Sequence, residues 1–189
     1  MCKKSSSFWT NEAEDRQIFG RNISKAEIEE RFHQLLSVNG PALIRLAASY
    51  TNSRSDRDDL FQDIALAIWQ ALPRFRGESS ERTFIFRIAH NRAITYMTQR
   101  RMPATSDEEI DLPDPRPNPE KGLAKEQQEA RLFEAIHALP IDYRQVITLT
   151  LEGLSYAEIA EVLGIGESNV GVRLNRARQL LRRLMEGQK

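Results

Sequence analysis

The feature that most constrains the fold is a pair of amphipathic helical patterns in residues 155–184, separated by a glycine turn. Ser155 is suited to cap the first helix, and Gly164 is suited to end it because glycine adopts the left-handed conformation at little cost. The second helix carries one apolar face, which consists of Val170, Leu174, Ala177, Leu181 and Leu184. A short helix, a tight turn and a longer basic helix together predict a helix-turn-helix.

The opposite face of the second helix carries mostly polar side chains. At about 100° per residue it consists of Ser168, Val172, Asn175, Arg176, Gln179 and Arg183. Arginine and glutamine donors of this reach suit base edges in the major groove of DNA. An ordinary helical hairpin with solvated arginines explains the same pattern, but the combination favours DNA binding.

Charge is distributed in opposed blocks, although 27 basic and 27 acidic residues cancel over the chain. Residues 73–102 hold seven arginines and two glutamates, and residues 164–185 hold five arginines and one glutamate. Residues 103–124 and 125–163 are both acidic. Two basic islands separated by acidic stretches favour two local DNA contacts over one general grip on a polyanion.

Several function classes lack the residues they require. Cys2 is the single cysteine, and His33, His90 and His137 share no ligand spacing, so we expect neither a disulfide nor a metal site. No phosphate-cradling glycine loop or nucleophile motif is present, so we expect no cofactor and no enzyme activity. No stretch is long and apolar enough to span a membrane, which favours a cytoplasmic protein without membrane insertion.

The N-terminal half shows three further patterns. Residues 25–52 predict two packing helices, the second beginning at Gly40-Pro41. Residues 56–72 predict a helix capped by Asp56 or Ser55, and the side opposite its core face carries Leu66 among acids and amides. A solvated face is the ordinary interpretation of such a strip, while the exposed leucine indicates a protein-binding surface.

Residues 73–102 interleave aromatic side chains with arginine. Phe84, Phe86 and Tyr96 are able to stack on unpaired bases while the guanidinium groups hold phosphate. A core helix with basic flanks explains the composition about equally well.

These patterns predict an all-α chain of two small helical domains, the second being the helix-turn-helix. We expect an N-terminal extension in residues 1–24, a first domain in 25–102, an acidic proline-rich linker in 103–122 and a second domain in 123–189. Proline and acidic residues keep such a linker from packing.

Three motifs in order resemble the bacterial RNA polymerase sigma factors of the extracytoplasmic-function (ECF) group. Residues 56–63, DRDDLFQD, are similar to the D-A-E-D-L-V-Q-E helix of that family. Residues 75–77 and 83–94 resemble F-x-G followed by T-W-L-Y-R-I-A-x-N-x-A-I. Residues 154–178 resemble the helix-turn-helix that reads the −35 element. The resemblance covers residues 27–185 and implies promoter recognition and transcription initiation without covalent chemistry.

The resemblance also implies partners and site residues. The first motif would bind the β′ clamp helices of core RNA polymerase, through Asp56, Asp58, Asp59, Gln62, Asp63 and Leu66. The second would melt and read the −10 element of promoter DNA, through Arg76, Arg82, Phe84, Arg87, His90, Asn91, Arg100 and Arg101. The third would read the −35 element through the polar face of its second helix given above. The polymerase β flap is a further expected contact, and control by an anti-sigma factor is expected although no residue identifies one.

The chain departs from the family pattern at a few positions. Phe84 replaces a tryptophan, and Gly171 and Val172 stand where charge or a hydroxyl is usual. We expect Arg173 to pair with Glu158 inside the domain rather than to touch DNA. Two other functions stay open from the residues: a stand-alone helix-turn-helix regulator, and a sigma-like protein-interaction adaptor that has lost promoter reading.

Overall fold

The computed structural model describes residues 24–101 and 131–186, and all regular secondary structure in these two ranges is helical. The all-α prediction is therefore confirmed for the described residues. The helices are α2 (Lys25–Ala48), α3 (Arg54–Ala71), the 3-10 turn η1 (Leu72–Arg74), α4 (Glu81–Arg101), a helix described over 131–137, α6 (Ile141–Leu151), α7 (Tyr156–Leu163) and α8 (Glu167–Glu186). The expected linker and nearly all of the expected N-terminal extension lie outside the described residues.

Helix α2 continues through Pro41, so the prediction of two helices in this region was wrong. A proline inside a helix costs about 3 kcal/mol because it removes one backbone hydrogen bond and crowds the preceding turn. Leu35 before the proline and Leu43 and Leu46 after it are buried on one core. Full burial of such side chains contributes about 1.5–3 kcal/mol each, so keeping them on one continuous face outweighs the break.

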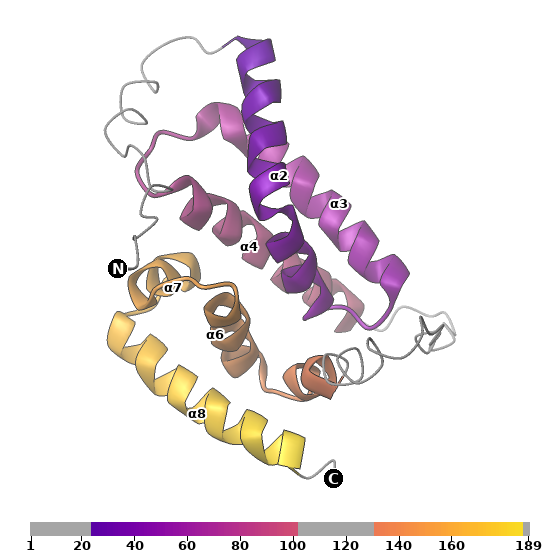
Figure 1. Cartoon of the computed structure of the whole chain (residues 1–189), viewed down its shortest axis with the longest axis vertical. Helices are drawn as coiled ribbons and strands as arrows, with labels where there is room; N and C mark the ends of the chain where they lie inside the picture. The colour runs from indigo at the N-terminus through magenta and orange to yellow at the C-terminus, as the bar shows by residue number, and fades with distance from the viewer. Residues whose placement is uncertain (1–23, 102–130, 187–189) are drawn as a thin grey trace, which may run out of the picture.

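Helices α2, α3 and α4 pack together, and with η1 they form what we call the N-terminal unit (Figure 1). Leu60, Ile64 and Ile68 of α3 are at most 2 % exposed, and Phe86 of α4 is fully buried. The cap of α3 is Ser53, whose hydroxyl accepts from the backbone N–H of Asp56 at 3.1 Å. The expected cap, Asp56 or Ser55, was wrong, because the helix begins at Arg54, two residues earlier than the periodicity indicated.

The C-terminal unit, from residue 131 to Glu186, contains the predicted helix-turn-helix, which is confirmed. Ser155 caps α7 in a reciprocal capping box with Glu158, and Gly164 ends the helix with φ 65°. Val170, Leu174 and Ala177 of α8 are fully buried on the side that faces α6 and α7. Two tight helix boundaries thus fix how α8 crosses α7.

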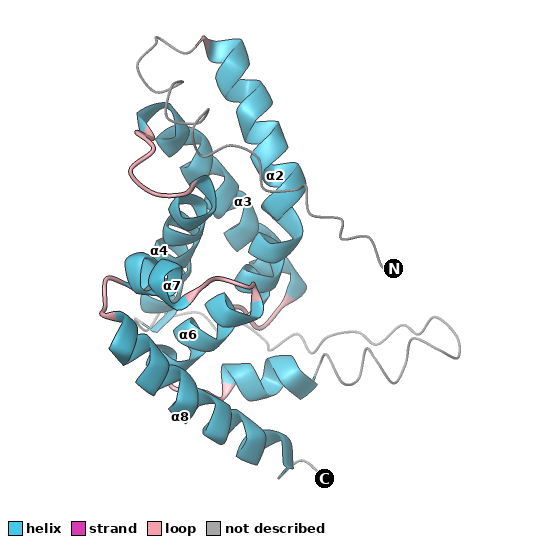
Figure 2. Ribbon diagram, turned by 60° about the vertical axis from the view of Figure 1, so that its left-hand side comes forward, coloured by secondary structure: helices cyan, strands magenta, loops and turns pink. Residues whose placement is uncertain are grey.

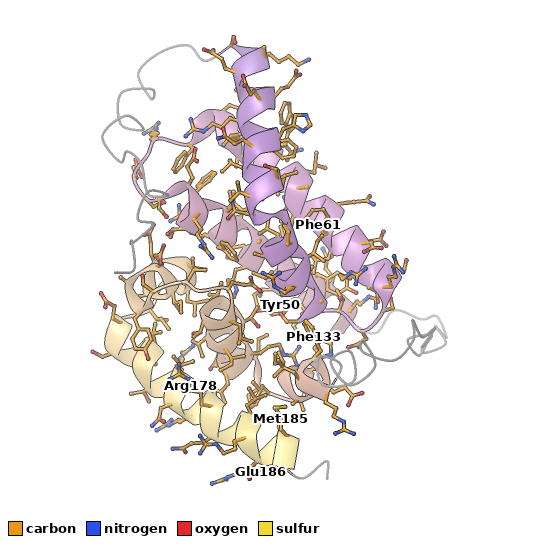
Figure 3. All side chains as sticks on the ribbon, in the orientation of Figure 1. Tyr50, Phe61, Phe133, Arg178, Met185 and Glu186 are labelled. Carbon is orange, nitrogen blue, oxygen red and sulfur yellow. The ribbon has the colours of Figure 1, made fainter. Side chains whose placement is uncertain are left out.

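The two units pack against each other and share one hydrophobic core. Figure 1 shows α7 beneath α4 and α6 beneath the end of α2, and α4 and α7 are in contact. Tyr50 lies just beyond α2 where it meets the C-terminal helices (Figure 3), and burial there raises the pKa of its phenol. The sequence patterns indicated two cores and did not predict this contact.

We expect opposite stability effects from alanine at two glycines of the C-terminal unit. Gly164→Ala forces a Cβ into the left-handed conformation and should lower the free energy of unfolding by about 1 kcal/mol. Gly171→Ala is its matched control, because the residue is helical and a Cβ there would lie 3.7 Å from Cε2 of Tyr156, an ordinary contact. This change should raise the free energy of unfolding by about 0.5–1 kcal/mol. Urea denaturation measures both, and equal effects would contradict the backbone explanation.

Candidate nucleic-acid and protein interfaces

Helix α8 presents its predicted polar face to solvent. Ser168, Val172, Asn175, Arg176, Gln179 and Arg183 are all exposed. Figure 2 shows α8 along the outer edge of the molecule, with α6 and α7 behind it. The core contacts therefore leave a complete strip of side chains that could enter a DNA groove. Val172, with 51 % of its surface exposed, is an apolar element of this strip that could meet a thymine methyl.

Arg173 holds α8 within the unit, but not through the expected partner. Its Nε donates to Oδ1 of Asn169 at 3.1 Å, and its Nη1 lies 3.6 Å from Oδ1 of Asp142 on α6. The expected pair with Glu158 was wrong, because that carboxylate accepts from the backbone N–H of Ser155 at 2.7 Å and completes the cap of α7. Arg173 thus ties α8 to α6.

A hollow lies between η1, the following loop and the start of α4. Its volume is about 290 Å³, and it is lined by Arg74, Phe75, Arg76, Glu78, Ser79, Phe84 and Arg87. The rings of Phe75 and Phe84 pack against each other at a tilt of 34°, with centroids 4.4 Å apart. Gly77 has φ 70°, which lets the loop turn sharply. Aromatic rings surrounded by guanidinium groups suit an unstacked base and its phosphate.

The structure brings three of the predicted −10 residues to this hollow: Arg76, Phe84 and Arg87. Asn91 is exposed farther along α4, and the side chain of Arg101 lies outside the described residues. Arg82 points elsewhere, since its Nη2 donates to the backbone carbonyl of Glu152 in the C-terminal unit.

His90 does not lie on the proposed DNA surface. It is only 6 % exposed, and burial lowers the pKa of its imidazole to about 4. A neutral, enclosed ring cannot contact phosphate or bases in this conformation, so we remove His90 from the surface. The family resemblance had placed His90 among the −10 residues. In the structure this position of α4 faces inward and is buried.

Arg100 and Asp56 form a two-pronged ion pair between the end of α4 and the start of α3. Arg100 also lies over the ring of Tyr96, with its Cζ 5.1 Å from the centroid. Burial and the negative charge of Asp56 raise the pKa of the Tyr96 phenol to about 12. Asp56 therefore positions α4, a role that the sequence analysis missed. The sequence did contain an indication of this ion pair, because acidic residues lie at the start of α3 and arginines lie at the end of α4.

The remaining acidic residues of the expected polymerase surface face solvent. Asp58, Asp59, Gln62, Asp63 and Leu66 are exposed on α3, and Leu66 has 54 % of its surface exposed. Asp63 lies 3.7 Å from Nη1 of Arg92, and Asp58 pairs with the neighbouring Arg57. The strip therefore consists of one exposed apolar residue with carboxylates and an amide around it, an arrangement that resembles an interface with a polar rim.

The described residues lack a metal-binding cluster and a membrane-spanning helix. Within residues 24–101 and 131–186 there is no group of His, Cys, Asp and Glu able to hold a metal ion. In the same part of the chain no helix is long and apolar enough to cross a membrane.

Comparison with known proteins decides the family. The sigma-70 region 2 model matches residues 35–102, and the sigma-70 region 4 model matches residues 129–181. The ECF RNA polymerase sigma-E factor of Haemophilus influenzae is 36 % identical over 140 residues, which are 68 % of this chain and 74 % of that protein. The chain belongs to the ECF sigma factors.

Solved structures agree with this assignment. CnrH in complex with the cytosolic domain of CnrY is 29 % identical, with TM-score 0.65 over 85 % of this chain and 91 % of that one. The sigma factor RpoE from Bartonella quintana, in complex with the anti-sigma factor NepR, is 22 % identical, with TM-score 0.66 over 85 % and 99 %. The second likeness concerns the fold. The sigma factor thus carries its hollow in the part matched by region 2 and α8 in the part matched by region 4.

Burial of His90 predicts an acid-sensitive stability. In the folded chain the pKa of His90 is about 4, below the ordinary 6.5. Between these pH values the unfolded chain therefore binds a proton at His90 and the folded chain does not. The stability of the fold with neutral His90 is fully present above pH 6.5 and is lost as the pH falls toward 4. Between pH 6.5 and 5 the free energy of unfolding should fall by about 1.5 kcal/mol more in the wild type than in His90→Gln. Urea denaturation at the two pH values measures this difference, and parallel losses would contradict it.

Proposed function

We propose that this sigma factor binds core RNA polymerase through α3, opens and reads the −10 element with the hollow and α4, and reads the −35 element with α8. The observation that carries the proposal is the polar face of α8, which is exposed along its length while the opposite face is buried. That face carries the long donors Arg176 and Gln179 in the part of the chain that the sigma-70 region 4 model matches, which favours DNA reading over a face that is merely solvated. The hollow and the α3 strip supply the two further surfaces that initiation requires.

The −10 surface consists of Arg76, Phe84 and Arg87 at the hollow, with Asn91 on the same helix. The ring of Phe84, which packs at a tilt on the buried Phe75, provides an aromatic surface for a base that has left the duplex. Arg76 is exposed and can hold a phosphate beside that base as it stands. Arg87, whose Nη1 lies 3.6 Å from Oε1 of Glu161, joins it only after it leaves that carboxylate. Arg82 joins this surface only after it leaves the carbonyl of Glu152.

We assign the polymerase contacts that the family resemblance implies to the surfaces described above. The α3 strip would meet the β′ clamp helices, and the C-terminal unit would meet the β flap. Polymerase contacts made from α3 would direct α8 to the upstream element. The chain itself would perform no covalent chemistry. The place of action would be the cytoplasm, where polymerase meets promoter DNA.

Control by an anti-sigma factor is a further part of the proposal. Two similar structures are complexes, one of CnrH with the cytosolic domain of CnrY and one of RpoE with the anti-sigma factor NepR. A protein of this kind could cover the exposed α3 strip and so prevent polymerase binding.

Reversal of one charge on α3 should separate polymerase binding from folding. Asp59→Lys places a cation within the strip and should weaken the affinity for core polymerase about tenfold, which is 1.4 kcal/mol. Glu30→Lys is the matched control, because it makes the same change at an exposed site of α2. Fluorescence anisotropy with purified core enzyme measures both. Equal affinities of the two variants would contradict the α3 assignment, and tight sequence-specific DNA binding without polymerase affinity would indicate a stand-alone regulator.

Truncation of one arginine on α8 should alter promoter choice. Arg176→Ala removes a long donor from the exposed face and should relax selectivity at one upstream position by about 1–3 kcal/mol. Arg178→Ala is the matched control, since Arg178 is also exposed (Figure 3) but lies about 120° around the helix from the centre of that face. Transcript sequencing from a library of random upstream elements, with reconstituted holoenzyme, measures the selectivity. Unchanged preferences in Arg176→Ala would count against the groove assignment.

A further inference from the structure

A buried carboxylate lies where the C-terminal unit meets the N-terminal unit. Glu152 follows α6 directly and is only 8 % exposed. Its Oε1 accepts from Nε of Arg45 at 3.0 Å, and its Oε2 accepts from Nη2 of the same arginine at 2.6 Å. This fork geometry is the strongest that arginine makes with a carboxylate. The hydrogen bonds to Glu152 raise the pKa of the Arg45 guanidinium.

The backbone carbonyl of Glu152 holds a second arginine of the N-terminal unit. Nη2 of Arg82 donates to it, while the guanidinium lies over the ring of Phe86 with Cζ 5.5 Å from the centroid. Gly153 adopts φ 80°, which turns the chain immediately after the carbonyl. One residue of the C-terminal unit therefore engages two arginines from α2 and α4.

Other contacts close the same boundary. Nη1 of Arg87 lies 3.6 Å from Oε1 of Glu161 on α7. Nε2 of His137 is 2.8 Å from the carbonyl of Ala48. The face of α8, by contrast, takes no part in the boundary and remains exposed. The contact between the units thus occupies Arg82 and Arg87 of the proposed −10 surface and leaves the proposed −35 surface open.

We infer that Glu152 locks the sigma factor in a closed state that withholds Arg82 and Arg87 from the −10 strand while α8 stays accessible. The inference rests on the proposed role of these two arginines. A partial opening is unfavourable, because a carboxylate that loses its arginine while still enclosed is left without compensation. Full separation of the two units hydrates Glu152 and Arg45 together, so we expect the ion pair to break in one cooperative step.

The first measurement is the distance between the units in the full chain. Cys2→Ser removes the native thiol, and spin labels at Gln70→Cys on α3 and Arg178→Cys on α8 occupy exposed positions of the two units. Arg45→Glu places two carboxylates against each other, and Glu152→Gln removes the charge with little change of volume. The Arg45→Glu/Glu152→Arg double variant restores an opposite-charge pair. Arg54→Glu is the control, since the Arg54 side chain is 87 % exposed and its charged partner is Asp58 of the same helix.

The second measurement is binding to DNA probes at low salt. One probe is an oligo-dT single strand and the other is a duplex of random sequence. If about one-tenth of the wild-type molecules are open, complete opening should raise the affinity for oligo-dT about tenfold. Affinity for the duplex, which α8 meets in either state, should stay the same.

The expected result is a longer, broader distance distribution and tighter oligo-dT binding in Arg45→Glu and Glu152→Gln. The control should match the wild type, and the double variant should return toward it. Unchanged distances in both single variants would overturn the lock, as would longer distances without any gain in oligo-dT binding. A gain that survives Arg82→Ala and Arg87→Ala together would keep the lock but refute the proposed strand role of these arginines.

Discussion

The packing of α4 is the interaction on which the rest of the structure depends. One side of this helix buries Ile85, Phe86, Ala89 and Ala93 against α2 and α3, and another part contacts α7. Alanines at two of these positions let neighbouring helices approach closely, while Phe86 fills the centre. The same helix supplies Arg82 and Arg87 of the proposed −10 surface. Its position relative to α7 therefore determines both the shared core and which arginines reach solvent.

Opposite charges meet inside the molecule as well as on its proposed interfaces. The blocks of acid and base that the sequence displays reappear as ion pairs between helices, such as Asp56–Arg100, Asp63–Arg92 and Glu152–Arg45. Pairs that remain largely exposed contribute about 0–1 kcal/mol each. Their main effect here is placement, because they determine which guanidinium groups remain available for phosphate. A basic block in the sequence thus overstates the basic surface of the fold.

Local features were predictable because their causes are local. The cap at Ser155, the stop at Gly164 and the exposed face of α8 follow from spacing and backbone preference, and the structure has all three. The failures concern neighbours far away in sequence. Pro41 stays inside a helix because leucines on both sides share one core, and His90 is buried by helices that the motif does not contain. The partner of Arg45 is 107 residues away, and no periodicity reports it.

The boundary between the units has the character of a reversible contact. Its ion pairs are partly exposed on the arginine side, with Arg45 and Arg87 at 55 % and 43 % side-chain exposure. Water can therefore reach these pairs, and separation replaces most of their energy by hydration. The buried apolar residues near the boundary favour closure, while polymerase and DNA would each offer Arg82 and Arg87 new partners. If Arg82 and Arg87 read the −10 strand as proposed, a contact that covers them and leaves α8 exposed would favour upstream engagement before strand opening.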